Sequence, residues 1–194
     1  MALRTWAGMT DRVISSRTVY KGWFDVLMLK LKLASGEEIE REVVEHPTGA
    51  AVLPFDVERR VAMLITEARP PVLHVGEERM LEVIAGMVED GDPADTARRE
   101  ALEEGGLSLD GLDHVARVWP TPATSTERVD YFLAEYQGQD RVGPGGGLPD
   151  EEEHVRIMEV PLSELWAMAE AGRLRDAKTL TLVQALRIRR PELF

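Results

Sequence analysis

The stretch Gly86–Leu107, GMVEDGDPADTARREALEEGGL, decides the fold of this chain. Asp92 is a good helix N-cap and the proline after it suits the first helical position, so the sequence predicts a helix that begins here. We expect this helix to run to Glu104 and to end at Gly105-Gly106, because glycine adopts the left-handed conformation of a helix C-terminus at little cost. Before the helix, Gly86–Gly91 is expected to form an acidic, glycine-containing loop.

Acidic side chains gather on one face of this expected helix. At about 100° per residue, Glu100, Glu103 and Glu104 share a face with Thr96, whereas alanines occupy another face. Like charges at this spacing destabilise an isolated helix by roughly 0.2–0.5 kcal/mol per pair, and a bound cation would reverse that sign. Carboxylates are hard oxygen ligands, which favours Mg²⁺ or Mn²⁺. The alternative is that the acids form a solvated helix face.

The order of these residues resembles the sequence box of the Nudix hydrolase family. Arg99-Glu100, Glu103-Glu104 and Gly106-Leu107 follow Gly86 in the order of that box. Members of the family hydrolyse nucleoside diphosphates linked to another moiety, and they use divalent metal on this loop–helix–loop. The resemblance therefore implies an enzyme that hydrolyses a pyrophosphate bond. Its cofactor would be Mg²⁺, with Mn²⁺ as the alternative.

The resemblance also implies roles for single residues. The metal ligands that it implies are Ala85 (through its main-chain carbonyl), Glu100, Glu104 and Glu103. Among the catalytic residues, which again include Glu103, Arg99 would orient a neighbouring acid by a charge-assisted hydrogen bond. Glu153 or Glu151, from the acidic run 150–153, would position or deprotonate the attacking water. Because this run is one residue longer than in the family, Glu152 could take either role.

Further residues match positions that contact substrate in the nucleoside-diphosphate-sugar branch of the family. Arg69, which precedes an expected loop at Val72–Glu78, is a planar fork that suits phosphate. Glu82, Glu127 and Lys178 complete the implied substrate-binding set. The alternatives are a solvated arginine, a solvent-facing Glu82, and structural ion pairs for Lys178; for Lys178 we favour the structural interpretation.

Departures from the usual box narrow the expected substrate. The interval from Gly86 to Arg99 is one residue shorter than in the family pattern, and Asp92 replaces its first glutamate. The shortened loop, with the segments GGGLP at 145–149 and RDAKT at 175–179, resembles the GDP-mannose pyrophosphatase subgroup. The expected reaction is hydrolysis of a nucleoside diphosphate sugar to a nucleoside monophosphate and a sugar 1-phosphate. ADP-ribose, which would give AMP and ribose 5-phosphate, is the alternative substrate.

Composition excludes several other classes of function. The chain has 194 residues, 44% hydrophobic and 30% charged, which is typical of a soluble globular protein with a sizeable core. Its net charge of −12 argues against nucleic acid as a partner, and it would repel an anionic substrate unless cations neutralised the site. Cysteine is absent, which excludes disulfides and thiolate catalysis. With no membrane-spanning or signal-like apolar segment, we expect a cytoplasmic protein without a membrane partner.

Strand and turn signals predict an α/β fold. Ala50–Phe55 and Arg60–Thr66 are expected to form a hairpin, and Met80–Ala85 a strand that leads into the box. The other expected elements are strands at His114–Trp119, Val129–Tyr136 and Val155–Val160, and helices at Ser163–Ala171 and Ala177–Arg189. Gln137–Pro149 is expected to be irregular. This order suggests a mixed sheet between helices, and the resemblance implies the Nudix α/β/α sandwich.

The N-terminal part predicts a separate β-structure. Arg17–His46 reads as an antiparallel hairpin, because apolar residues alternate along Leu27–Leu33. A two-stranded hairpin is marginal alone, so it needs either a third strand, for which Arg12–Thr18 is a candidate, or a partner surface. The resemblance implies a sheet that packs across a homodimer; the alternative is that the hairpin extends the main sheet. We therefore expect a dimerisation segment at 1–48 and a Nudix hydrolase domain at 49–194.

Two interpretations without enzymatic activity stand beside the hydrolase. One is a Nudix fold used for nucleotide sensing, which predicts loss of the box acids, yet Glu100, Glu103 and Glu104 are all present. The other is an acidic cation-binding scaffold, which predicts metal binding without release of a nucleoside monophosphate.

Overall fold

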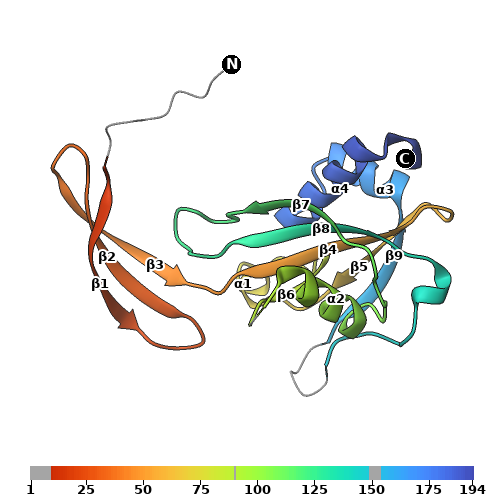
Figure 1. Cartoon of the computed structure of the whole chain (residues 1–194), viewed down its shortest axis with the longest axis horizontal. Helices are drawn as coiled ribbons and strands as arrows, with labels where there is room; N and C mark the ends of the chain where they lie inside the picture. The colour runs from red at the N-terminus through yellow and green to blue at the C-terminus, as the bar shows by residue number, and fades with distance from the viewer. Residues whose placement is uncertain (1–9, 90, 149–153) are drawn as a thin grey trace. The chain divides into compact units, whose positions relative to one another are not determined.

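The computed structural model describes residues 10–89, 91–148 and 154–194 (Figure 1). These residues form two compact units. The smaller unit contains the described residues up to Pro47 together with Thr121–Glu127, and the larger unit contains Thr48–Pro120 together with Arg128–Phe194. Among the described residues, no helix is long and apolar enough to span a membrane.

The smaller unit is built on a three-stranded antiparallel sheet. Its strands are β1 (Arg12–Tyr20), β2 (Asp25–Lys32) and β3 (Glu38–Glu45), in the order β1-β2-β3. The predicted hairpin and its third strand are therefore confirmed, and the alternative that the hairpin extends the main sheet is wrong. Apolar side chains of β1 and the turn after it are exposed, among them Val13, Val19, Tyr20 and Trp23.

The larger unit contains a mixed six-stranded sheet. Its strands are β4 (Gly49–Asp56), β5 (Val61–Thr66), β6 (Ile84–Met87), β7 (Asp113–Val118), β8 (Val129–Glu135) and β9 (Arg156–Pro161). Five of them have the order β7-β8-β4-β5-β9, and β6 pairs with β4. β4 and β8 are parallel, whereas the other pairs are antiparallel.

Helices cover both faces of this sheet, which confirms the predicted α/β/α sandwich. Figure 1 shows α2 (Pro93–Glu103) on one side and both α3 (Leu162–Glu170) and α4 (Ala177–Arg189) on the other. Residues of β4 alternate between two core clusters, so that Ala50 and Val52 pack with α2 while Ala51 and Leu53 pack with α3 and α4. The strand is buried along its whole length because both of its faces are covered.

Two local predictions are wrong. A strand is expected at Met80–Ala85, but the structure has β6 at Ile84–Met87, so Gly86 lies within a strand and not in a loop. The strand extends this far because its backbone pairs with β4, beginning at the first residue of β4. The loop expected at Val72–Glu78 begins inside a short helix, α1 (Pro70–His74). Paired prolines end a strand, but they are well tolerated in the first turn of a helix, where their missing N–H groups have no partner to lose.

A buried tyrosine and an ion pair join three strand ends on the larger unit. Arg59, in the turn between β4 and β5, donates to both carboxylate oxygens of Glu159 on β9, with one contact at 2.7 Å. The hydroxyl of Tyr136, which follows β8, donates to the same carboxylate at 2.8 Å. The hydrogen bonds from Arg59, opposed by partial burial and assisted by Tyr136, lower the pKa of Glu159 to about 2. Burial and this carboxylate raise the pKa of Tyr136.

This arrangement predicts a specific pH dependence of stability. The folded-state pKa of Glu159 lies below its ordinary value of 4.5, so its contribution is fully present above about pH 4.5 and is lost as the pH falls through about 2. We expect Glu159→Gln to lower the free energy of unfolding by roughly 1 kcal/mol at pH 7, because Arg59 is half exposed. Denaturant titrations from pH 7 to pH 3 should show this difference shrink below pH 4.5. A constant difference would contradict the assignment.

Candidate functional site

The helix of the predicted box begins and ends where its sequence indicates. The side chain of Asp92 caps α2 by accepting a hydrogen bond from the N–H of Ala94 at 2.9 Å. The helix ends at Glu103, and Gly106 has a left-handed φ of 68°. Ala97 and Ala101 are buried against β4 and its neighbours. Because these side chains are small, the backbone of α2 can approach the sheet closely.

Glu100 lies directly against β6 at Gly86. A Cβ atom at Gly86 would be 1.8 Å from Oε1 of Glu100 and 2.2 Å from its Cδ, so only glycine leaves room for this carboxylate. Glu100 is 7% exposed, and the Nη2 group of Arg99 donates to its Oε1 at 2.7 Å. The alternative that the helix acids form a solvated face is wrong for Glu100.

Glu104 is held next to Glu100, one helical turn further on. It is 2% exposed, and its Oε2 accepts a hydrogen bond from the N–H of Ala85 at 3.3 Å. Glu103 is more exposed and receives a hydrogen bond from Nη1 of Arg99 at 2.7 Å. Burial opposes the charge of Arg99, but the neighbouring carboxylates outweigh it and raise the pKa of the guanidinium. Arg99 therefore contacts two box acids at once, where the resemblance implies the orientation of one; its part in catalysis stays a prediction.

Glu82 lies two residues before β6 and is 1% exposed. The alternative that it faces solvent is therefore wrong. The Nε group of Arg69 donates to Glu82 at 3.0 Å, and its Nη1 group pairs with Glu67 at 2.8 Å. Burial of Arg69 lowers the pKa of its guanidinium, but Glu82 and other nearby acids outweigh burial and raise it. Arg69 is thus fixed by carboxylates and is not a freely solvated side chain.

Lys178 lies on the other side of Glu82, in the first turn of α4. Its Nζ is 2.8 Å from Oδ1 of Asp176 and 3.6 Å from Oε2 of Glu82. Asp176 caps α4 by accepting from the N–H of Thr179. These are ion pairs of the kind that the structural interpretation of Lys178 predicts; its role toward substrate stays a prediction.

Three acids therefore lie in order along the segment that leads into and through β6. We call Glu82, Glu104 and Glu100 the acidic row. Arg69 and Lys178 flank the row at Glu82, and Arg99 flanks it at Glu100. Glu104, the middle member of the row, also contributes to raising the pKa of Arg69.

The glycine-rich segment before the acidic run contacts the end of α2. The N–H groups of Gly146 and Gly147 donate to the carbonyls of Glu104 and Glu103, at 2.8 and 3.1 Å. The segment is irregular, as predicted, apart from a short 3-10 helix, η1 (Gly138–Asp140). Glu151 and Glu153, the candidate general bases, lie outside the described residues, as does Glu152.

Glu127 belongs to the smaller unit, where its carboxylate is 3.9 Å from Nδ1 of His46. His46 itself stacks on Phe24. The predicted role of Glu127 in substrate binding is not tested by these contacts and stays a prediction.

The donor atoms of the acidic row suit a hard divalent cation. Two buried carboxylates one helical turn apart, beside the main chain of β6, offer the oxygen ligands that Mg²⁺ prefers. Within residues 10–89, 91–148 and 154–194, no three acidic or histidine side chains lie close enough together to form a metal-binding group by themselves.

Sequence reasoning missed Glu67, Asp176 and Thr179, which hold the predicted residues in place. The capping pattern of an aspartate three residues before a threonine at the start of α4 could have identified Asp176 and Thr179. Glu67 has no comparable local signal, since its contact with Arg69 depends on how the chain turns after β5.

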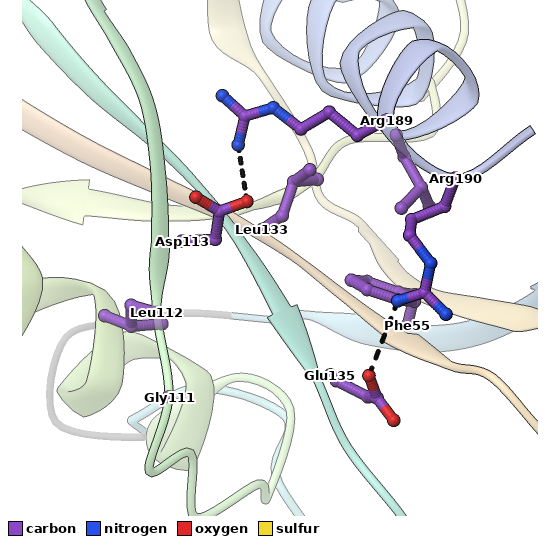
Figure 2. Close-up of a pocket in the computed structure, with 9 residues that line it drawn as sticks. Phe55, Gly111, Leu112, Asp113, Leu133, Glu135, Arg189 and Arg190 are labelled. Carbon is purple, nitrogen blue, oxygen red and sulfur yellow. Dashed lines mark hydrogen bonds and ion pairs between the residues drawn. The ribbon is translucent and has the colours of Figure 1, made fainter.

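A cavity of about 370 Å³ lies away from the acidic row, at the C-terminal end of α4 (Figure 2). Its apolar lining includes Phe55, Leu133 and Leu186, which belong to the core cluster packed with α3 and α4. Figure 2 shows Arg189 directed toward Asp113 and Arg190 directed toward Glu135 at its rim. The acidic row meets α4 at its first turn, whereas the cavity lies at the other end of that helix, so this cavity is not the candidate catalytic site.

Comparison with known proteins identifies the class to which this fold and site belong. The NUDIX domain family matches residues 45–183. A GDP-mannose pyrophosphatase of Cronobacter sakazakii is 35% identical over 152 residues, covering 77% of this chain and 78% of the relative. Another from Pectobacterium atrosepticum is 31% identical over 183 residues, covering 91% and 94%. The chain belongs to the Nudix hydrolase family.

A solved structure agrees with this family at the level of the fold. A crystal structure titled ADP compounds hydrolase matches with a TM-score of 0.73 at 19% identity, covering 94% of this chain and 95% of that chain. The fold and family predicted from Gly86–Leu107 are therefore confirmed. The family and the relatives together identify the chain as a pyrophosphohydrolase.

The close approach of Glu100 to Gly86 can be tested by stability measurements. We expect Gly86→Ala to lower the free energy of unfolding by about 1–3 kcal/mol, because the new methyl group displaces the buried carboxylate. Gly49→Ala, on the paired strand, is the matched control, since its Cβ would meet nothing nearer than 3.4 Å. In a Glu100→Ala background the cost of Gly86→Ala should largely disappear. Equal costs at both glycines in urea titrations would contradict the geometry.

Proposed function

We propose that this protein hydrolyses the pyrophosphate bond of a nucleoside diphosphate sugar of the GDP-mannose type, in a reaction that depends on Mg²⁺. The products would be a nucleoside monophosphate and a sugar 1-phosphate. The observation that carries the proposal is the buried pair Glu100 and Glu104 seated against Gly86 and Ala85, at the place where the family keeps its catalytic box. The names of the relatives from Cronobacter and Pectobacterium support GDP-mannose as the substrate.

The proposed metal site uses few protein ligands. Glu100, Glu104 and the carbonyl of Ala85 would hold Mg²⁺. Glu103 does not form a metal-binding group with these two carboxylates among the described residues, so it would have to reorient to become a further ligand. Mg²⁺ commonly binds through one or two carboxylates and completes its coordination with water and substrate phosphates. When bound, the cation would neutralise phosphate charge and polarise the phosphorus that water attacks. It would also remove the conflict between an anionic substrate and a chain of net charge −12.

The remaining roles fall to the side chains around the acidic row. Arg99 holds Glu100 and Glu103 in their orientations. Arg69, Glu82 and Lys178 would bind substrate, and the positive charges of Arg69 and Lys178 would attract its phosphates. Glu153 or Glu151 would position the attacking water and accept its proton. In this proposal the protein is a cytoplasmic homodimer joined through the sheet of β1, β2 and β3, whose exposed apolar side chains would be covered by the partner.

ADP-ribose is the second candidate substrate. The structural neighbour titled ADP compounds hydrolase supports it, because the shared fold extends over nearly the whole of both chains. The two substrates share a diphosphate and differ in base and sugar, so the acidic row would treat both alike.

The proposal predicts a metal-dependent and Glu104-dependent release of nucleoside monophosphate. GDP-mannose, ADP-ribose and ADP-glucose are incubated with the protein and Mg²⁺, and GDP-mannose should give the highest kcat/KM. We expect Glu104→Gln to lower kcat/KM by about 100-fold or more, because a ligand of the cation loses its charge. Glu164→Gln, at an exposed position on α3, is the matched control and should leave kcat/KM unchanged.

Three results would contradict the proposal. Comparable slow turnover of all three compounds would refute the GDP-mannose assignment. Full activity of Glu104→Gln would refute the metal assignment. Tight Mg²⁺ binding without any release of nucleoside monophosphate would favour a cation-binding scaffold over an enzyme.

A further inference from the structure

The first turn of α4 is connected to the acidic row by three hydrogen bonds and an ion pair. The hydroxyl of Thr179 accepts from the N–H of Val83 at 2.8 Å and donates to Oδ2 of Asp176 at 2.7 Å. Oδ1 of Asp176 accepts from Nζ of Lys178 at 2.8 Å, and Lys178 in turn lies 3.6 Å from Glu82. Val83 and Glu82 are adjacent in sequence, so these contacts begin and end on the short segment before β6.

The hydroxyl and the two carboxylates that surround Lys178 are protected from solvent. Thr179 is fully buried, Asp176 is 6% exposed and Glu82 is 1% exposed. Because the hydroxyl of Thr179 already accepts from a backbone N–H, its own proton is directed to Asp176, which must act as an acceptor. Burial would raise the pKa of Asp176, but Lys178 and then Thr179 outweigh it and lower the pKa, so the carboxylate is charged.

The two oxygens of Asp176 have separate tasks. Oδ2 accepts hydrogen bonds from both the N–H and the hydroxyl of Thr179, and in this way Asp176 caps α4. Oδ1 receives only Lys178 among the contacts that the described residues make with it. Asp176 therefore restrains a flexible lysine, whose side chain would otherwise sample many rotamers, at a fixed distance from Glu82.

We propose that Asp176 is a positioning residue for the hydrolysis proposed above: it holds Lys178 beside Glu82, so that Arg69, Glu82 and Lys178 present a fixed set of charges to the phosphates of the substrate. This inference rests on the proposed function. Asp176 acts through Lys178 and does not itself touch the substrate. Its effect is on binding, which predicts a change in KM with little change in kcat.

Asp176→Asn separates the two tasks of the side chain. The amide oxygen can still accept from Thr179, and asparagine caps helices as well as aspartate does. The amide NH₂ group then faces Lys178, and two donors cannot bond to each other. We expect a melting temperature lowered by only about 2–4 °C, because the ion pair with Lys178 is lost while the helix cap is kept. KM should rise about tenfold and kcat should stay within about twofold of the wild type.

Asp56→Asn is the matched control. Asp56 is also buried, at 3% exposed, and it accepts the N–H of Arg59 three residues later, at 2.8 Å, as Asp176 accepts that of Thr179. It lies at the C-terminal end of β4, whereas β6 pairs with the N-terminal half of that strand. We expect Asp56→Asn to leave KM unchanged. Equal KM values for Asp176→Asn and Asp56→Asn would overturn the inference.

A double-mutant cycle tests whether Asp176 acts through Lys178. Lys178→Gln should raise KM, and adding Asp176→Asn to it should raise KM no further, because the group that Asp176 positions is already absent. Additive effects of the two substitutions would overturn the inference, since Asp176 would then act by another route. An unfolded or strongly destabilised Asp176→Asn protein would also overturn it, by showing a purely structural role.

A measurement without turnover distinguishes failure of this inference from failure of the proposed function. The ¹⁵N NMR signal of the Lys178 ammonium should be protected from exchange in the wild type and in Asp56→Asn, and lost in Asp176→Asn. A signal that persists in Asp176→Asn would show that Asp176 does not hold Lys178. If the signal behaves as expected but the wild type releases no nucleoside monophosphate from the substrate panel, the proposed function fails, and the role of Asp176 in hydrolysis fails with it.

Discussion

The seating of α2 on β6 is the constraint on which the rest of the site depends. Small side chains at Ala97 and Ala101 let the helix approach the sheet, and the missing side chain at Gly86 leaves space for Glu100. The same approach places Glu104 within hydrogen-bonding distance of the backbone of Ala85. Carboxylates that would repel one another on an isolated helix are thus buried together, and Arg99 compensates the charge of Glu100.

Charge compensation explains why the site is more than a cluster of acids. Each end of the acidic row carries a guanidinium, and Lys178 adds an ammonium at the Glu82 end. Burying a charge without a partner is costly, so each buried acid requires either a basic side chain or a cation near it. The arginines are themselves fixed by second carboxylates, Glu67 for Arg69 and Glu103 for Arg99. A substrate diphosphate would therefore meet a preorganised pattern of charge rather than mobile side chains.

The sequence predicts those features whose cause is local. The capping of α2 by Asp92, the end of that helix at glycine and the existence of strand β2 depend on neighbouring residues, and they agree with the structure. The sequence predicts a loop at Gly86, whereas the structure has a strand there, because the strand depends on pairing with β4, which is distant in sequence. The same limitation applies to Asp176, whose bond to Lys178 is local while its importance comes from Glu82, far away in the chain. Burial of the box acids likewise follows only from how α2 packs.

The central claim is that Glu100 and Glu104 hold a divalent cation against β6. Anomalous diffraction from crystals soaked in Mn²⁺, which can replace Mg²⁺ at oxygen sites, tests it directly. The account predicts an anomalous peak within about 2.5 Å of oxygen atoms from both carboxylates. The absence of a peak there after a soak at saturating Mn²⁺, with both carboxylates still in contact with Gly86 and Ala85, would contradict it.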